Sequence, residues 1–147
     1  MNYDVNKFNG LKAGAETFNS AHKALNAVMQ AFQVQNPNHQ SYFLISKIVN
    51  QALFCEIGLK ALIVRDGNAY GKIHKLDKLF GSLNQDAQTD IIAKTGLDKN
   101  TFDKLIVNNN DVFVNWRYFF EGNATCNPEF MDKFSDAIFN VLHSKNR

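Results

Sequence analysis

The segment from residue 41 to residue 65 most constrains the fold, because it is apolar around most of a helical circumference. Its apolar positions recur at steps of three and four, which place one face of an α-helix at Ile45, Val49, Ala52, Leu59 and Ile63. A helix of this kind needs cover on most sides, so we expect it to be the central and most buried helix of a bundle. Its only polar arc is expected at Lys47, Asn50 and Gln51.

Helical periodicity continues along the chain, and strand signals are nearly absent. It predicts further helices at about 8–34, 76–83, 85–94 and 99–121, and a last helix that begins at Pro128 after Asn127 as N-cap. Gly67 is the expected C-terminal cap of the central helix. Short connections between long helices favour antiparallel packing. The sequence therefore predicts an all-α fold: a single up-and-down bundle of five or six helices that forms one domain over residues 1–147.

Three of these helices have a well-defined apolar face. The first helix is expected to bury Leu11, Ala15, Phe18, Ala21, Leu25, Val28 and Phe32. The last helix is expected to bury Phe130, Phe134, Ala137, Ile138, Val141 and Leu142. The helix at 76–83 adds Leu76, Leu79, Phe80 and Leu83.

Composition excludes several classes of function. The net charge is only +2 and the basic residues are scattered, so strong DNA binding is not expected. Cys55 and Cys126 lack metal-ligand spacing and the histidines are dispersed, so we predict no metal and no cofactor. No signal peptide and no run of about twenty apolar residues is present. The expected location is the cytoplasm, without a membrane contact.

Glu56 falls in the middle of the apolar face of the central helix. An unpaired carboxylate there would cost several kcal/mol, so a cation and hydrogen-bond donors should compensate it. The candidates are Lys60 one turn further on, His74 after the helix and Arg117 on the later aromatic helix. Arg117 is favoured because a guanidinium tolerates such sites and binds a carboxylate with two donors. The alternatives are a surface pair of Arg117 with Glu121 and a local pair of Glu56 with Lys60.

Three other polar or aromatic features allow both a structural and a functional interpretation. His74 stands where a loop becomes a helix, and capping or a buried structural bond is favoured over general-base catalysis. The run Asn108-Asn109-Asn110-Asp111 is unusual inside a helix. A solvated face is favoured there over a polar groove that binds a nucleotide or a partner helix. Trp116 and Tyr118 flank Arg117 and could stack on bases, although core packing is the simpler interpretation.

The order of these motifs resembles HEPN domains, the helical family named for nucleotide binding in higher eukaryotes and prokaryotes. The resemblance rests on Glu56-Ile57-Gly58-Leu59-Lys60-Ala61-Leu62-Ile63, on His74-Lys75-Leu76-Asp77-Lys78-Leu79-Phe80 and on Phe113-Val114-Asn115-Trp116-Arg117-Tyr118. It covers about residues 51 to 122. It implies a bundle of four or five helices that often dimerises. It also implies either RNA cleavage, as in toxins and antiviral effectors, or a nonenzymatic partner role beside nucleotidyltransferases.

The chain departs from the ribonuclease members at one position. Those members carry a histidine four to six residues after the arginine, whereas here Gly122, Asn123 and Ala124 follow Arg117 at the corresponding places. The resemblance therefore implies a noncatalytic module that binds a nucleotide, RNA or a partner protein, in prokaryotic defence or a toxin–antitoxin system. The alternatives are a metal-independent endoribonuclease that uses Arg117 with His74, and a structural homodimer without a ligand. A homodimer is also expected from the aromatic residues around Phe113, Trp116, Phe119 and Phe120.

Overall fold

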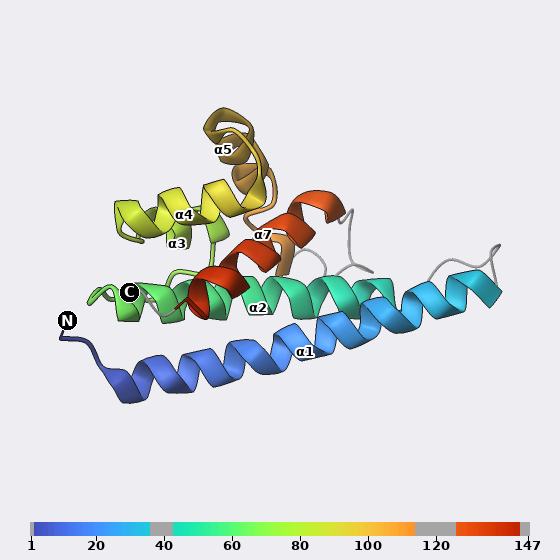
Figure 1. Ribbon diagram of the computed structural model, residues 1–147, viewed down its shortest axis with the longest axis horizontal. Helices are drawn as coiled ribbons and strands as arrows, with labels where there is room; N and C mark the ends of the chain where they lie inside the picture. Colours follow the sequence, from blue (N-terminus) through green and yellow to red (C-terminus); the bar gives the residue numbers. More distant parts are fainter. Residues whose placement is uncertain (1, 36–42, 114–125, 145–147) are drawn as a thin grey trace.

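The computed structural model describes residues 2–35, 43–113 and 126–144 (Figure 1). The regular structure in these ranges is helical and forms six helices: α1 (Val5–Gln35), α2 (Leu44–Arg65), α3 (Leu76–Gly81), α4 (Gln85–Thr95), α5 (Lys99–Asn108) and α7 (Pro128–Leu142). The predicted all-α class and the number of helices are confirmed. The buried apolar side chains of these helices form one connected cluster.

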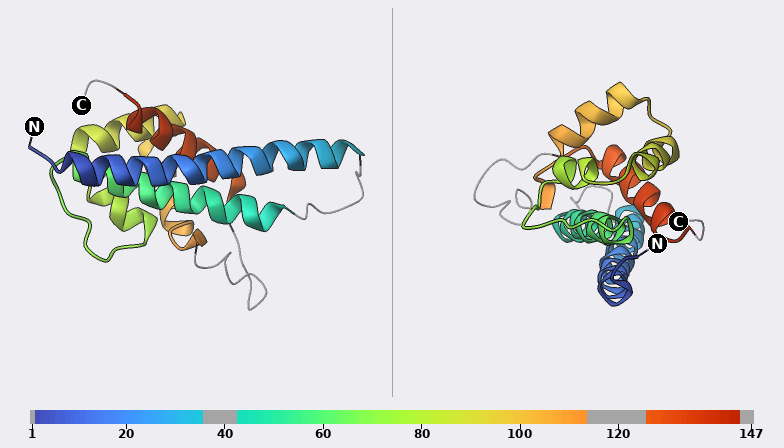
Figure 2. Two further views of the ribbon diagram at one scale, coloured as in Figure 1. Left: turned by 90° about the horizontal axis from the view of Figure 1, so that it is seen from below. Right: turned by 90° about the vertical axis from the view of Figure 1, so that its left-hand side faces the viewer.

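Helix α2 is the central element of the bundle. It runs antiparallel to α1, which covers one side, while α3 and α7 pack on the other (Figures 1 and 2). Ala52, Leu59 and Ile63 are fully buried, as predicted. Ile45, however, is 39% exposed, so the prediction that it is buried was wrong. Val28 in the C-terminal part of α1 is 46% exposed, so its predicted burial was wrong as well.

The predicted polar arc of α2 is also corrected. Lys47 and Gln51 are buried rather than solvated. Helix α7 crosses α2 at this level and supplies hydrogen-bond partners for both side chains, Asp132 and Ser135. A polar residue on a helix can therefore lie in an interface when the neighbouring helix carries matching groups.

Helix α7 begins and packs as the sequence predicts. The Asn127 side chain accepts a hydrogen bond from the backbone N–H of Phe130 at 2.9 Å, which caps the helix. The whole predicted apolar face is buried. At the other end, the Arg65 guanidinium donates to the carbonyl oxygens of Val141 and Leu142 at 3.1 and 3.3 Å. Arg65 thus satisfies carbonyl groups that have no partner within α7 and fixes the end of α7 to the end of α2.

The single helix predicted over residues 99–121 does not form. Helix α5 ends at Asn108, and a turn follows at residues 109–111. Asn109 is buried and its side chain bonds the backbone on both sides: Nδ2 donates to the Leu105 carbonyl at 2.7 Å, and Oδ1 accepts from the N–H of Asn127 at 2.8 Å. The asparagine side chain competes with the helical hydrogen bonds and ends the helix. The solvated face favoured for this run describes the exposed Asn108 but not the buried Asn109.

Candidate ligand site around Glu56

Glu56 lies on the buried face of α2, with 6% of its surface exposed. Its Oε1 accepts a hydrogen bond from Lys60 Nζ at 2.8 Å and another from His74 Nδ1 at 2.7 Å. Lys60 is the residue one turn further along α2, and it is buried as well. Lys60 therefore compensates the charge of the buried carboxylate, and His74 adds a second hydrogen bond. The third candidate, Arg117, lies outside the described residues, as do Trp116 and Tyr118.

Tyr70 completes the surroundings of Lys60. The Lys60 ammonium lies 5.2 Å from the centre of the Tyr70 ring, and the Lys7 ammonium lies 4.9 Å from the same centre. A cation near the face of an aromatic ring is attracted by the ring's electron density. Tyr70 therefore connects the first turn of α1 with the buried pair of Glu56 and Lys60.

His74 reaches Glu56 from the loop before α3. The residue at the N-cap of α3 is Lys75, and no side chain caps that helix. Of the two structural roles expected for His74, the bond to a buried group is found and the cap is not. Its side chain is 66% exposed although Nδ1 is bound to the buried carboxylate. Since an ionised carboxylate only accepts, Nδ1 must carry the proton that forms this bond. The carboxylate thus fixes the ring orientation, and within the described residues no group binds Nε2.

A small hollow opens beside this cluster. Its walls are formed by Ala52, Glu56, His74, Leu76, Asn110, Asp111 and Phe113. The turn that ends α5 brings Asn110 to this place, where its carbonyl oxygen accepts from the N–H of Leu76 at 3.2 Å. Its side-chain amide lies 3.5 Å from Asp77 Oδ1. An imidazole, a carboxylate and an amide from three separate segments therefore line one hollow next to an aromatic ring.

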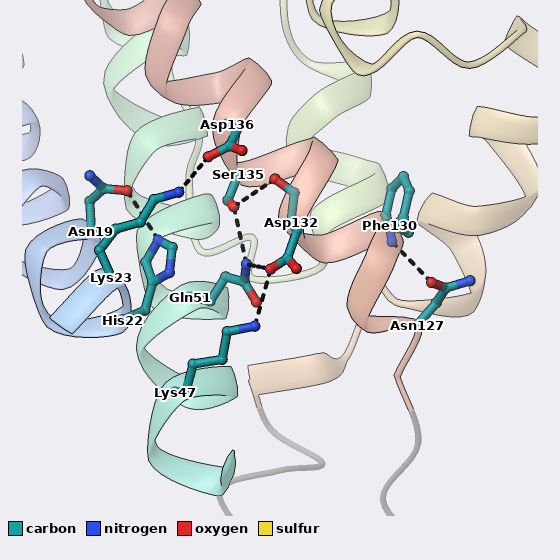
Figure 3. Close-up of polar contacts among 10 residues, drawn as sticks. All are labelled: Asn19, His22, Lys23, Lys47, Gln51, Asn127, Phe130, Asp132, Ser135 and Asp136. Atoms are coloured by element: carbon teal, nitrogen blue, oxygen red, sulfur yellow. Dashed lines mark hydrogen bonds and ion pairs between the residues drawn. The ribbon is translucent and has the colours of Figure 1, made fainter. Parts of the chain in front are cut away.

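A second polar cluster, which the sequence did not reveal, lies between α2 and α7 (Figure 3). Asp132 Oδ1 accepts from Gln51 Nε2 at 2.7 Å and from Lys47 Nζ at 3.1 Å. Gln51 Nε2 also lies 3.1 Å from Ser135 Oγ, while Gln51 Oε1 is buried without a partner. The only sequence signal was the position of Asp132 and Ser135 on α7, directly beside its apolar face.

His22 lies near this cluster, on the side of α1 that faces α2 (Figure 3). Its Nε2 is 3.0 Å from Asn19 Oδ1. Burial, followed by the positive charges of Lys23 and Lys47, lowers the pKa of His22 from 6.5 to about 4. The imidazole is therefore neutral near pH 7. Because an amide oxygen accepts, Nε2 carries the proton and donates to Asn19 Oδ1.

Both cysteines lie in surroundings that keep their thiols protonated. Burial raises the pKa of Cys55, which is enclosed in the core as predicted, and burial also raises the pKa of the half-buried Cys126. Both thiols are therefore protonated and weakly nucleophilic near neutral pH. Within residues 2–35, 43–113 and 126–144, no three His, Cys, Asp or Glu side chains are placed to hold one metal ion.

Comparison with known proteins gives no relative. No protein-family model, no curated protein and no solved structure matches this chain. Among the helices of the described residues, none combines the length and the apolar character that a membrane crossing requires.

Proposed function

We propose that this chain is a noncatalytic HEPN-like module that binds a nucleotide, RNA or a partner protein, in prokaryotic defence or a toxin–antitoxin system. One observation carries the proposal: Glu56, His74 and Asn110 come from three separate segments, yet they line a single hollow. Glu56 and His74 belong to two of the segments on which the resemblance rests. The third such segment begins at Phe113, which also lines the hollow.

The hollow is small, with a volume of about 20 Å³, so it supports contact with a small polar group of a ligand and not enclosure of a whole base. Asn110 and His74 supply donors and acceptors, and Phe113 adds an apolar wall. Such combinations of a few polar groups with an apolar surface are typical of ligand sites. Two carboxylates line the hollow. Lys60 offsets the charge of Glu56, and the Lys75 ammonium lies 3.6 Å from Asp111.

The test is a binding series with defined ligands. Titration calorimetry with AMP and ATP, and fluorescence anisotropy with a single-stranded RNA oligonucleotide, measure affinity for the wild type and for His74→Ala and Asn110→Ala. We expect at least tenfold weaker binding in both variants. Asn108→Ala is the matched control, because this asparagine is exposed and does not line the hollow. Affinities that are equal in all four proteins would contradict the site. A failure of every probe to bind would overturn the nucleotide and RNA arms of the proposal and leave a partner protein or the structural homodimer.

A second candidate is an endoribonuclease that uses Arg117 with His74. The observation that favours it is the bond between His74 Nδ1 and Glu56, because a carboxylate that orients an imidazole is a common arrangement for a general base. Against it stands the sequence after Arg117, which lacks the histidine of the ribonuclease members. We therefore expect no cleavage of structured or single-stranded RNA. Cleavage that both Arg117→Ala and His74→Ala abolish would replace the noncatalytic proposal with this one.

A further inference from the structure

One ring nitrogen of His74 is bound to a buried carboxylate, while the other has no partner within the described residues. Nδ1 lies 2.7 Å from Glu56 Oε1, and the His74 side chain is nevertheless 66% exposed. Because Nδ1 carries the proton of this bond, the lone pair of the neutral ring lies on Nε2. Donation of the Nδ1 proton to a carboxylate also makes Nε2 more basic. Nε2 is therefore an oriented nucleophile on the surface of the protein.

Glu56 can fix this orientation because it has little freedom to move. Only 6% of its surface is exposed, and the same Oε1 accepts a hydrogen bond from Lys60 Nζ at 2.8 Å. Both residues lie on α2, the central helix of the bundle. The carboxylate therefore holds the imidazole in one position and does not follow its movements.

The other two histidines in the described part of the chain lack this combination. His22 is buried, and its Nε2 is 3.0 Å from Asn19 Oδ1. Both ring nitrogens of His143 have partners, because Nδ1 lies 2.8 Å from a backbone carbonyl oxygen and Nε2 lies 2.6 Å from Glu16 Oε1. Of these three histidines, only His74 combines an exposed ring with an unbound nitrogen.

The segment that carries this histidine is positively charged. Three lysines and one aspartate lie within residues 72–78. The Lys75 ammonium has an acidic partner, Asp111, at 3.6 Å. Lys72 and Lys78 are exposed and form no ion pair with any described residue. A group that brings negative charge to Nε2 is therefore favoured at this surface.

We propose that His74 Nε2 is a phosphoryl acceptor site, with an activated phosphoryl compound of the acyl phosphate class as the donor. The Nε2 lone pair attacks phosphorus and forms an N–P bond, while the bond between phosphorus and the acyl oxygen breaks. The carboxylate of the donor leaves with that electron pair. No proton moves, because the ring keeps its Nδ1 proton and gains one positive charge. This charge lies against Glu56 and beside the phosphoryl dianion, and both stabilise it.

Incubation of the purified protein with acetyl phosphate tests the proposal, with the modified residues located by peptide mass spectrometry at neutral to alkaline pH. We expect a phosphoryl group on His74 to appear at least tenfold faster than on His22 or His143. Denaturation in urea should remove this preference, because it breaks the bond to Glu56. No phosphoryl group on His74, a rate equal to that of His143, or a preference that survives in urea would overturn the proposal.

A double variant tests Glu56 as a positioning residue for His74. In Glu56→Gln combined with Lys60→Met, the amide oxygen can still accept from Nδ1, but no negative charge faces the ring and no ammonium is left without a partner. We expect at least fivefold slower phosphorylation of His74, with an unchanged circular dichroism spectrum. A wild-type rate in this variant would show that exposure alone explains the reaction and would overturn the role of the carboxylate.

A second pair of variants tests the choice of an anionic group. Lys72→Gln combined with Lys78→Gln should slow phosphorylation of His74 at least threefold. Lys94→Gln is the matched control, because this lysine is exposed but lies on α4. Equal rates in the two variants would overturn the selection of a phosphoryl group. All rates are measured without nucleotide or RNA, so failure of this site and failure of the proposed ligand site can be distinguished.

Discussion

Alanine in place of glycine should have opposite effects at two helical positions of this protein. Gly58 lies on α2 where α7 crosses it, and a Cβ atom there would lie 2.8 Å from Ile138 Cγ2. Gly10 lies on the exposed side of α1, and a Cβ atom there would meet no heavy atom within 4 Å. Both substitutions raise helix propensity by about 1 kcal/mol. Only Gly58→Ala also introduces a steric conflict.

The cost of the Gly58→Ala substitution depends on how freely α7 can move away from α2. Ordinary contacts to a Cβ atom begin near 3.4 Å, so Ile138 would have to retreat by about 0.6 Å. Ile138 is fully buried, and α7 is fixed by Gln51 on one side and by Arg65 at its end. Overpacking of such a core costs about 1–3 kcal/mol. We therefore expect Gly58→Ala to lower the free energy of unfolding by up to about 2 kcal/mol and Gly10→Ala to raise it by about 0.5–1 kcal/mol.

Urea denaturation followed by circular dichroism measures both effects as shifts of the midpoint at constant slope. Gly14→Ala is a second control, because its Cβ would lie 3.9 Å from Ile57 Cγ2, an ordinary contact, and it should be neutral or stabilising. Ile138→Ala removes the conflicting methyl group at a cost of its own of about 2–5 kcal/mol. In that background Gly58→Ala should become stabilising. If Gly58→Ala stabilises the wild type as much as Gly10→Ala does, or destabilises the Ile138→Ala protein as much as the wild type, the reasoning is refuted.

Three further predictions concern polar groups. Glu56→Ala should lower the free energy of unfolding by about 3 kcal/mol because it leaves the buried Lys60 ammonium without its carboxylate. The double substitution Glu56→Leu and Lys60→Met should recover most of the lost unfolding free energy, because it removes both charges. A double variant less stable than Glu56→Ala would count against the ion pair of Glu56 and Lys60. Because the pKa of His22 is lowered to about 4 in the folded state, its contribution to stability is complete above pH 6.5 and declines as the pH falls toward 4. Between pH 8 and pH 5 the free energy of unfolding should fall by about 2 kcal/mol more in the wild type than in His22→Gln. If urea titrations give the same pH dependence for both proteins, the buried imidazole is not neutral. Asn127→Ala should cost about 1 kcal/mol by removing the cap of α7, and no change in the thermal midpoint would contradict that role.

The sequence predicts the helices well where one periodic pattern is bounded by clear end signals. Asn127 and Pro128 marked the start of α7, and Gly67 marked the end of α2 with the positive φ expected of such a cap. The break at Asn109 was missed because periodicity continues across it. It depends on a hydrogen bond with Asn127, which is distant in the chain and invisible to local propensity.

The same limit applies to the two polar clusters. The need to compensate Glu56 followed from its place on an apolar face, and the choice among its partners depended on where the loop before α3 lies. The burial of Lys47 and Gln51 could not be foreseen, since it depends on Asp132 from a helix whose crossing point on α2 is set by tertiary packing. Val28 and Ile45 are exposed because their burial depends on how far the neighbouring helices extend. Hydrophobic periodicity predicts the side of a helix that is buried, but not the length over which it is covered.

The central position of α2 has a consequence for how the chain folds. Helices α1 and α2 are adjacent in sequence, so their hairpin closes a short loop and can form early. The opposite face of α2 is covered by α7, which is synthesised after the other described helices. Until then the apolar side of α2 stays open to chaperones or to other nascent chains. Substitutions on the face of α7 that packs against α2 should therefore slow folding and raise aggregation during synthesis more than their effect on the stability of the finished protein would suggest.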